Sequence, residues 1–391
     1  MFNATKNKIL PTAMIGSFPK PTWFTESLNG RPFKVAMGDS LYREQYIDAV
    51  RCYISEQEQA GLDIMVDGDS RNDLEVGGRS WFFYTIERLN GISGFRDSSH
   101  FLDYGGMKPG HILYEVQEAW QPPSVTGKIT EGTLQFVDMW KTAQKMTRRP
   151  VKFGNICATC LPMMLWNDYY KTDQEMIMDI AAVMNEEYVA LAEAGCQVIQ
   201  IEEPVHHFNC QKEPPCTDKD LQFYTDAFNR QTKNVNTEIW AHTCWGNPNQ
   251  QSFYWERPSY ERSLPYFLEM NCDVLDIECA SNQARDAKLF KNVDWNKYDK
   301  KIGIGVVDHT RTTVETPDMV ADIIRRALEY IPQERLIITA DCGFGREGLS
   351  RRIASYKCVS LVLGANIVRR ELGLEEAYVA TADERYAFTE A

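Results

Sequence analysis

Residues 173–202 read DQEMIMDIAAVMNEEYVALAEAGCQVIQIE, and they contain the two patterns that decide the fold. Asp173–Ala194 has the amphipathic spacing of a helix. Val198–Glu202 is a short run of Val and Ile, as expected for a strand that is covered on both faces. Thr316 before Pro317 is typical of a helix start. Further helices are predicted at Gln45–Ala60, Pro317–Tyr330 and Leu349–Leu363.

Short apolar runs alternate with these helices along most of the chain. The predicted strands are Thr12–Ile15, Ile64–Asp67, Val151–Ile156, Val198–Glu202, Glu238–Thr243, Val274–Glu278, Ile302–Val307 and Leu336–Ala340. Alternating βα units predict a parallel sheet in an α/β fold. Eight strands favour a closed (β/α)8 TIM barrel, with a doubly wound sheet as the alternative.

The segment at about 81–130 interrupts the alternation, because it is rich in aromatic residues and glycine and contains a ninth predicted strand, Ser124–Ile129. We interpret it as a β-rich arm inserted between the second and third barrel units. No Pro/Ser-rich linker or change of composition marks a domain boundary. A single catalytic barrel over residues 1–391 is therefore expected.

Composition excludes several classes of protein. The chain has 391 residues and a net charge of −13, which argues against a protein that binds nucleic-acid phosphates. No apolar run is long enough for a membrane span, and the N-terminus does not have the pattern of a signal peptide. The 11 cysteines lack the spacing of a disulfide framework. We therefore expect a cytoplasmic protein with reduced or metal-bound thiols.

Polar side chains gather where the predicted strands end, which is the catalytic face of such barrels. His242 and Cys244 are two residues apart on a strand and so point to the same face. Glu278 and Cys342 lie at the ends of other strands. Imidazole, thiolate and carboxylate are zinc ligands, and four of them make a tetrahedral set. Buried core thiols and a hydrogen-bonded core histidine are the alternative, but the joint placement favours a Zn²⁺ site.

The charge of this ligand set indicates its chemistry. Two thiolates and a carboxylate give a bound Zn²⁺ ion a negative formal charge, which suits the binding of another thiol better than the production of hydroxide. A substrate sulfur held as a thiolate near neutral pH is a nucleophile. The residues therefore predict alkylation of a thiol rather than zinc-assisted hydrolysis.

The ordered set of motifs resembles the catalytic barrel of the cobalamin-independent methionine synthase family. The matching segments are Ile15-Gly16-Ser17-Phe18-Pro19, His242-Thr243-Cys244, Asp276-Ile277-Glu278, Gly305-Val306-Val307-Asp308-His309 and Asp341-Cys342-Gly343. The resemblance implies a barrel of the methionine synthase/uroporphyrinogen decarboxylase-like type and a Zn²⁺ site at His242, Cys244, Glu278 and Cys342. It also implies a catalytic proton donor at His309. The N-terminal half of the long enzymes has no counterpart, so a short, core-only member is expected.

The same resemblance implies a homocysteine pocket. Its backbone-binding turn falls on Ile15, Gly16 and Ser17, and the two acids that hold the amino group fall on Asp69 and Glu202. Trp166 matches the tryptophan on which the pterin stacks, or is an apolar wall. Glu118-Ala119 and Phe208 depart from the family pattern on the folate side. The methyl donor therefore stays open between a folate and a corrinoid protein.

The remaining polar residues have two interpretations each. His206 and His207 do not match the family, and we interpret them as helix-capping or backbone-bonded histidines rather than as part of a donor pocket. Arg71 and Arg79 could face a carboxylate or a sulfonate, but isolated arginines are more often structural. The glycines of Gly343–Gly348 suit either an anion-binding helix start or a tight turn.

The sequence leads to one principal hypothesis, zinc-dependent methylation of the thiol of homocysteine. Epoxide opening by a zinc thiolate, as in epoxyalkane:coenzyme M transferase, is the nearest alternative; its thiol has a sulfonate and no amine. Metal-free decarboxylation of the uroporphyrinogen decarboxylase type would require arginines for substrate carboxylates. A non-catalytic barrel with a structural zinc is the last alternative. The predicted partners are a small-molecule thiol and a methyl or alkyl donor, with no nucleic acid and no membrane.

Overall fold

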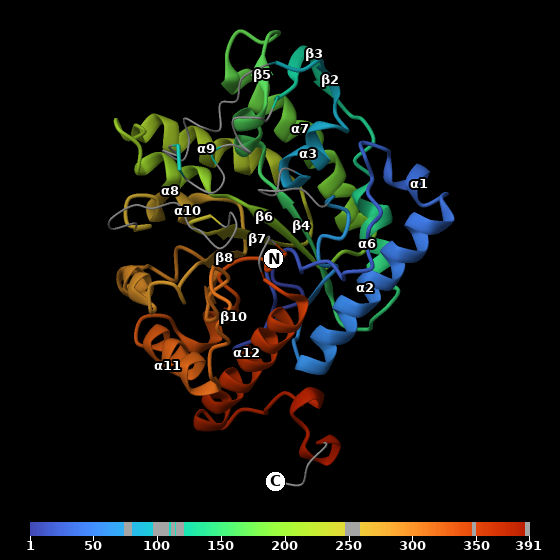
Figure 1. The fold of residues 1–391 in the computed structure, drawn as a ribbon. Helices are drawn as coiled ribbons and strands as arrows, with labels where there is room; N and C mark the ends of the chain where they lie inside the picture. The colour runs from blue at the N-terminus through green and yellow to red at the C-terminus, as the bar shows by residue number, and fades with distance from the viewer. Residues whose placement is uncertain are drawn as a thin grey trace.

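Seven parallel strands form the centre of the computed structural model, in the spatial order β1-β4-β6-β7-β8-β9-β10 (Figure 1). The structure describes residues 1–73, 80–96, 109–110, 114, 121–246, 259–345 and 349–387. The strands are β1 (Met65–Val66), β4 (Val151–Ile156), β6 (Val198–Glu202), β7 (Glu238–Thr243), β8 (Val274–Ile277), β9 (Lys301–Gly305) and β10 (Leu336–Thr339). The predicted α/β fold of TIM type is confirmed, as a curled parallel sheet that has seven strands among the described residues where eight were predicted.

The two edges of the curled sheet meet at one short segment. Thr12 forms a parallel bridge to Ile338 of β10, and Ala13 forms one to Ile64, just before β1. The prediction of a full strand at Thr12–Ile15 is therefore wrong. Only single bridges form there, because the segment enters between the two edges and then turns away at Gly16, which has a φ of +57°.

The bounds of the central strands agree closely with the prediction. β4, β6 and β7 have the predicted first and last residues. β8 and β10 each end one residue earlier than predicted, whereas β1 is limited to two residues. Glu278 and Asp341 therefore lie just beyond the last residues of β8 and β10, whereas Glu202 and His242 are still paired within β6 and β7.

Helices cover the outside of the curled sheet (Figure 1). They are α1 (Phe33–Ala36), α2 (Ser40–Ala60), α3 (Ser80–Ile86), α6 (Phe136–Gln144), α7 (Asp173–Glu193), α8 (Val205–Cys210), α9 (Asp218–Gln231), α10 (Leu264–Glu269), α11 (Pro317–Leu328) and α12 (Arg351–Glu371). The Thr316 side chain accepts the N–H of Met319 and caps α11, as predicted.

Helix α12 differs from the prediction, which ended it at Leu363. It continues through Gly364 to Glu371. A Cβ atom at Gly364 would lie 2.4 Å from Val320 Cγ1 of α11. The low helix propensity of glycine would suggest that the helix ends at this position. Instead the helix continues, and the missing side chain allows α11 and α12 to pack closely.

A small three-stranded sheet lies beside the barrel, in the order β2-β3-β5 (Figure 1). It contains β2 (Asn90–Ser93), β3 (Ser124–Thr130) and β5 (Trp166–Asn167). β3 is the predicted ninth strand, one residue longer than expected, and it pairs antiparallel with β2 and parallel with β5. Much of the rest of the predicted arm, including Glu118-Ala119, lies outside the described residues.

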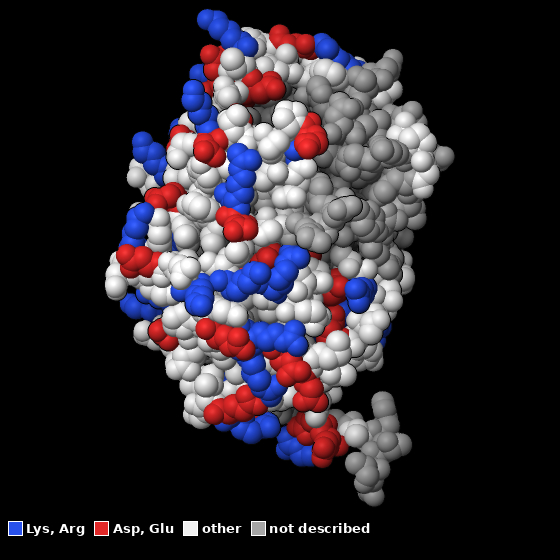
Figure 2. Space-filling view, turned by 90° about the vertical axis from the view of Figure 1, so that its left-hand side faces the viewer, with Lys and Arg blue, Asp and Glu red and all other residues white. Residues whose placement is uncertain are grey.

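The surface carries both signs of charge. On the face shown in Figure 2, Lys and Arg side chains lie among Asp and Glu side chains, so the acidic excess is not gathered into one patch there. Among the helices of the described residues, none combines the length and the apolar composition that crossing a membrane requires.

Candidate functional site

Three predicted metal ligands from two strand ends come together at the barrel mouth. The ligand atoms of His242, Cys244 and Cys342 all lie within 4.8 Å of one another, and all three residues are buried. The two sulfur atoms are 3.5 Å apart. Two sulfurs on one tetrahedral Zn²⁺ ion with Zn–S bonds of about 2.3 Å lie roughly 3.8 Å apart, so this spacing suits zinc.

The orientation of His242 also fits a metal ligand. Its Nδ1 is hydrogen-bonded to Asp276 Oδ2, and its Nε2 is buried with no hydrogen-bond partner among the described residues. Nε2 lies 3.7 Å from Glu202 Oε2, which is beyond hydrogen-bonding distance. A carboxylate at one ring nitrogen and no protein hydrogen-bond partner at the other are typical of histidines that bind metals.

The protonation of the cluster reflects how closely its groups lie. The Cys244 thiol, as a hydrogen-bond partner, holds the pKa of Cys342 well below the ordinary thiol value, against the effect of burial. The pKa of Cys244 is raised correspondingly. Burial opposes the charged form of His242, but Glu202 and Asp276 hold the pKa of this histidine well above its usual range. The two thiols, the imidazole and the adjoining carboxylates therefore shift one another's pKa values, as expected for ionisable groups that lie close together.

Glu278 lies beside this cluster but not within it. It is buried at the end of β8, where its Oε2 accepts the Trp245 N–H at 2.7 Å and its Oε1 accepts the Ser281 hydroxyl at 2.5 Å. Cys342 raises the pKa of Glu278 in addition to the larger effect of burial, which indicates that the two groups are neighbours. Its role as the fourth ligand stays a prediction.

The contact between Asp276 and His242 gives a first testable prediction. Asp276 also accepts the Thr339 hydroxyl at 2.6 Å, so its carboxylate is fixed toward His242. In Asp276→Asn, an amide N–H₂ group facing Nδ1 would favour the ring tautomer with its proton on Nε2. We expect zinc affinity to fall about 10–100-fold, as measured by competition with a chromophoric chelator. Asp286→Asn, at a buried carboxylate paired with Arg285, should leave zinc affinity unchanged; an unchanged affinity in Asp276→Asn would contradict the prediction.

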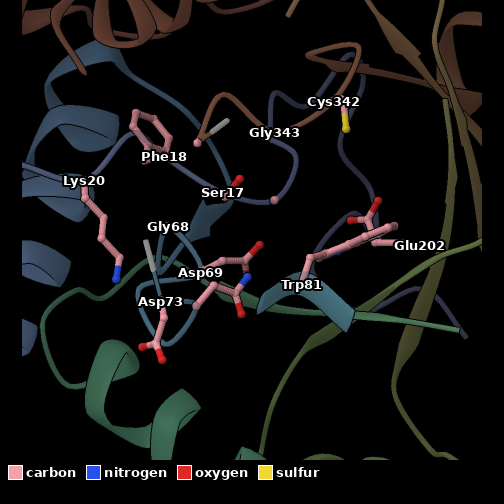
Figure 3. Close-up of a pocket in the computed structure, with 13 residues that line it drawn as sticks. Ser17, Phe18, Lys20, Gly68, Asp69, Asp73, Trp81, Glu202, Cys342 and Gly343 are labelled. Atoms are coloured by element: carbon pink, nitrogen blue, oxygen red, sulfur yellow. The ribbon is translucent and has the colours of Figure 1, made fainter. Parts of the chain in front are cut away.

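A pocket opens next to the metal-ligand cluster (Figure 3). Its lining residues are Gly16, Ser17, Phe18, Lys20, Gly68, Asp69, Asn72, Asp73, Trp81, Glu202, Cys342, Gly343 and Gly345. Cys342 and Glu202 lie on one side of the view, and Lys20 and Asp73 lie on the other. The sulfur of a predicted ligand therefore faces the same cavity as the predicted amino-acid binding groups.

The two predicted acids converge on the turn at Gly16. A Cβ atom at Gly16 would lie 3.6 Å from Asp69 Oδ2 and 3.8 Å from Glu202 Oε1. Burial raises the pKa of Glu202 to about 7, with Cys342 and Asp69 adding to the shift and His242 opposing it. An ammonium group bound between these two acids would offset their repulsion and favour their ionised forms.

Ser17 presents polar groups to the same cavity. Neither its backbone N–H nor its hydroxyl has a hydrogen-bond partner within the described part of the chain, although its carbonyl accepts the N–H groups of Phe344 and Gly345 at 2.7 and 2.9 Å. An unpaired N–H beside an unpaired hydroxyl suits a carboxylate. Ile15, in contrast, packs its side chain into the apolar floor of the barrel.

Two predicted site residues lie apart from this pocket. Trp166, on β5, lines a different cavity together with Met163, Phe223 and Tyr224, and the two cavities share none of their described lining residues. His309 is buried; its Nε2 contacts Gly246 O at 3.0 Å, and its Nδ1 has no hydrogen-bond partner among the described residues. His309 lowers the pKa of Glu278 and Cys342, so it lies near the cluster without lining the pocket.

The other polar residues singled out from the sequence have structural partners. Arg71 is buried and donates to Asp69 Oδ1 at 3.0 Å and to Gly154 O at 2.6 Å. His206 contacts Glu203 and Thr225, whereas His207 contacts the Cys244 carbonyl at 2.6 Å. Arg79 and residues 346–348 lie outside the described residues.

Several residues line the pocket although the sequence analysis gave them no role in the site, among them Lys20, Asn72, Asp73 and Trp81. Lys20 follows Ser17 by three residues and Asp73 follows Asp69 by four, so both belong to loops that had already been recognised. Burial lowers the pKa of Lys20 to about 8, with Asp73 opposing the shift. The position of these residues in loops that follow strand ends was the available signal for a place in the site. That position does not indicate which loop side chains point into the pocket.

Comparison with known proteins gives consistent results. Residues 10–89 and 106–360 match a family profile described as "Cobalamin-independent synthase, Catalytic domain". The methionine synthase of Sulfolobus acidocaldarius is 31% identical over 366 residues, which cover 93% of this chain and 94% of that protein. The methionine synthase of Saccharolobus solfataricus is 32% identical over 370 residues, covering 94% of this chain and 97% of that protein.

Solved structures agree in fold. A B12-independent methionine synthase from Shewanella sp. W3-18-1, in complex with selenomethionine, superposes with a TM-score of 0.70 at 25% identity, covering 93% of this chain and 99% of that one. A putative vitamin-B12 independent methionine synthase from Listeria monocytogenes has a TM-score of 0.65 at 18% identity, covering 92% and 99%.

Proposed function

The chain belongs to the cobalamin-independent methionine synthase family, and from this premise we propose that it transfers a methyl group to the thiol of homocysteine. One observation carries the proposal: the sulfur of Cys342 faces the same pocket as Ser17, Asp69 and Glu202. A soft-ligand cluster and an amino-acid binding site are thus adjacent, as methylation of an amino-acid thiol requires.

The donor set fits zinc, which we assign to His242, Cys244, Cys342 and Glu278. When bound, zinc supplies a Lewis acid that keeps the substrate sulfur as a thiolate near neutral pH. Asp276 holds His242 in the metal-binding orientation. The buried sides of the site exclude water, which would otherwise solvate the thiolate and lower its reactivity.

The remaining residues orient the substrate and manage a proton. Asp69 and Glu202 would hold the ammonium group, and the N–H and hydroxyl of Ser17 would bind the carboxylate. His309 would protonate the leaving group of the methyl donor. With Nε2 donating to the Gly246 carbonyl, Nδ1 is the atom from which the proton would be given.

The pocket favours an amine-bearing thiol over the alternatives. Its described lining includes three carboxylates, Asp69, Asp73 and Glu202, but one cation, Lys20, and no arginine. Coenzyme M has a sulfonate and no amine, and uroporphyrinogen decarboxylase chemistry requires cations for several carboxylates. A purely structural zinc would not require the adjoining pocket.

Ligand exchange at the metal tests the proposal. With cobalt in place of zinc, we expect homocysteine to change the thiolate-to-metal absorption bands at lower concentration than coenzyme M does. Methyl transfer is then assayed with a methylated folate and with a methylated corrinoid as donors, because the sequence leaves both open. Tighter binding of coenzyme M, or no spectral change with either thiol, would contradict the assignment.

A further inference from the structure

A buried lysine lies inside the barrel, beneath the pocket. Lys152 is on β4, and its Nζ donates to Gln200 Oε1 at 2.5 Å and to the Met14 carbonyl at 2.7 Å. Nζ also lies 4.3 Å from the centre of the Trp240 ring, in the apolar floor of the barrel. Burying an ammonium group costs folding free energy unless its N–H groups are hydrogen-bonded. The buried position of Lys152 therefore suggests that this lysine has a specific role.

One partner of Lys152 connects it to the ammonium-binding side of the proposed amino-acid site. Gln200 Nε2 donates to Glu202 Oε1 at 2.5 Å, which connects the lysine to the proposed ammonium-binding acid. Met14 directly precedes the turn that contains Gly16 and Ser17. The contact through Gln200 reaches the Glu202 carboxylate itself, whereas the contact at Met14 is with a main-chain carbonyl and does not extend to the N–H or hydroxyl of Ser17.

The hydrogen-bond directions make the lysine decisive for Glu202. An ammonium group only donates, so Gln200 must present its carbonyl oxygen to Lys152 and its N–H₂ group to Glu202. Without the lysine, the Gln200 amide could turn and place its oxygen against the carboxylate. Lys152 also lies among several buried carboxylates, including Glu202, Asp69 and Asp276, whose charges it offsets.

We propose that Lys152 is a positioning residue for the substrate amine, acting through Gln200 on Glu202. The proposal rests on the proposed function, because it assigns the amine of homocysteine to Glu202. It does not place Lys152 in contact with the substrate or with the metal. Its effect should therefore depend on whether the thiol carries an amine.

Two thiols separate positioning from general support of the fold. Zinc-loaded wild-type protein and Lys152→Met are titrated by calorimetry with homocysteine and with 4-mercaptobutanoate, which lacks only the amine. We expect Lys152→Met to weaken homocysteine about 10-fold, the effect of one hydrogen bond to a charged group, and 4-mercaptobutanoate less than about twofold. Equal weakening of both thiols, or of neither, would overturn the proposal.

Two further variants complete the experiment. Gln200→Met breaks the hydrogen-bonded connection between Lys152 and Glu202 but keeps the lysine. It must therefore weaken homocysteine more than 4-mercaptobutanoate, as Lys152→Met does. If Lys152→Met does not fold, the result for Gln200→Met decides whether the proposal stands. Lys301→Met is the matched control, because Lys301 is also a buried strand lysine, bonded to the carbonyls of Thr5 and Lys8 at 2.6 and 3.1 Å. It should keep the wild-type preference between the two thiols.

The outcomes distinguish this inference from the proposed function. If wild-type protein binds homocysteine no better than 4-mercaptobutanoate, the assignment of the amine to Asp69 and Glu202 fails, and the inference fails with it. If the wild type prefers homocysteine and the Lys152 and Gln200 variants keep that preference, the proposed function stands and the inference is wrong.

Discussion

Cys342→Ser is expected to lower zinc affinity by more than about 100-fold and to reduce methyl transfer to background. Loss of a residue that merely orients a ligand costs about 10–100-fold in metal affinity, so loss of a thiolate ligand must cost more. Cys342 is also the ligand that faces the substrate pocket. Zinc content after dialysis and turnover of homocysteine are the two measurements.

A matched cysteine serves as the control. Cys196 is also buried, and its thiol donates to the Val198 carbonyl. Val198 is the first residue of β6, at the opposite end of that strand from the barrel mouth. A serine hydroxyl can keep that hydrogen bond, so Cys196→Ser should retain zinc and turnover. Full zinc content and normal activity in Cys342→Ser would remove the basis for the metal assignment.

The fold was predictable where burial dictates the sequence. Both faces of β4, β6 and β7 are covered, so their apolar runs and their polar ends mark the strand bounds directly. Thr12–Ile15 has the same composition but forms only bridges, because the chain leaves the sheet edge at Gly16. An apolar composition indicates that a segment is buried, but it does not indicate how many of its residues pair with neighbouring strands.

The site was predictable where the spacing of residues along a strand fixes the direction in which their side chains point. His242 and Cys244 share a face because they are two apart on one strand, and Cys342 joins them because parallel strands end at one rim. Glu278 sits at the correct strand end, yet both of its oxygens accept hydrogen bonds from nearby groups. Such local partners are invisible in a sequence pattern.

Long side chains were the least predictable part. Lys152 reaches from β4 to the Met14 carbonyl and to Gln200 on another strand. Nothing in the run VKFGNI indicates that its lysine turns inward, since an isolated lysine in a strand is usually read as exposed. Trp166 was placed in the site by resemblance, but the structure places it on a different cavity.

Gly343→Ala should abolish most of the substrate affinity while the metal site persists. A Cβ atom at Gly343 would lie 2.6 Å from Ser17 N and 2.9 Å from Ser17 Oγ. The loops cannot separate freely, because Ser17 O accepts the N–H groups of both Phe344 and Gly345. Overpacking of about 3 kcal/mol corresponds to roughly a 100-fold loss of homocysteine affinity, measured by calorimetry on zinc-loaded protein.

This variant separates two functions of neighbouring residues. Gly127→Ala is its control, because among the described residues a Cβ atom there meets Gly91 Cα alone, at 3.8 Å, in the small sheet. If Cys342 binds the metal, Cys342→Ser loses zinc binding and thiol binding together. If Gly343 keeps Ser17 accessible, Gly343→Ala loses thiol binding, while its zinc affinity changes less than about tenfold. Undiminished homocysteine binding in Gly343→Ala would show that the carboxylate does not bind at Ser17, because the added methyl group occupies that position.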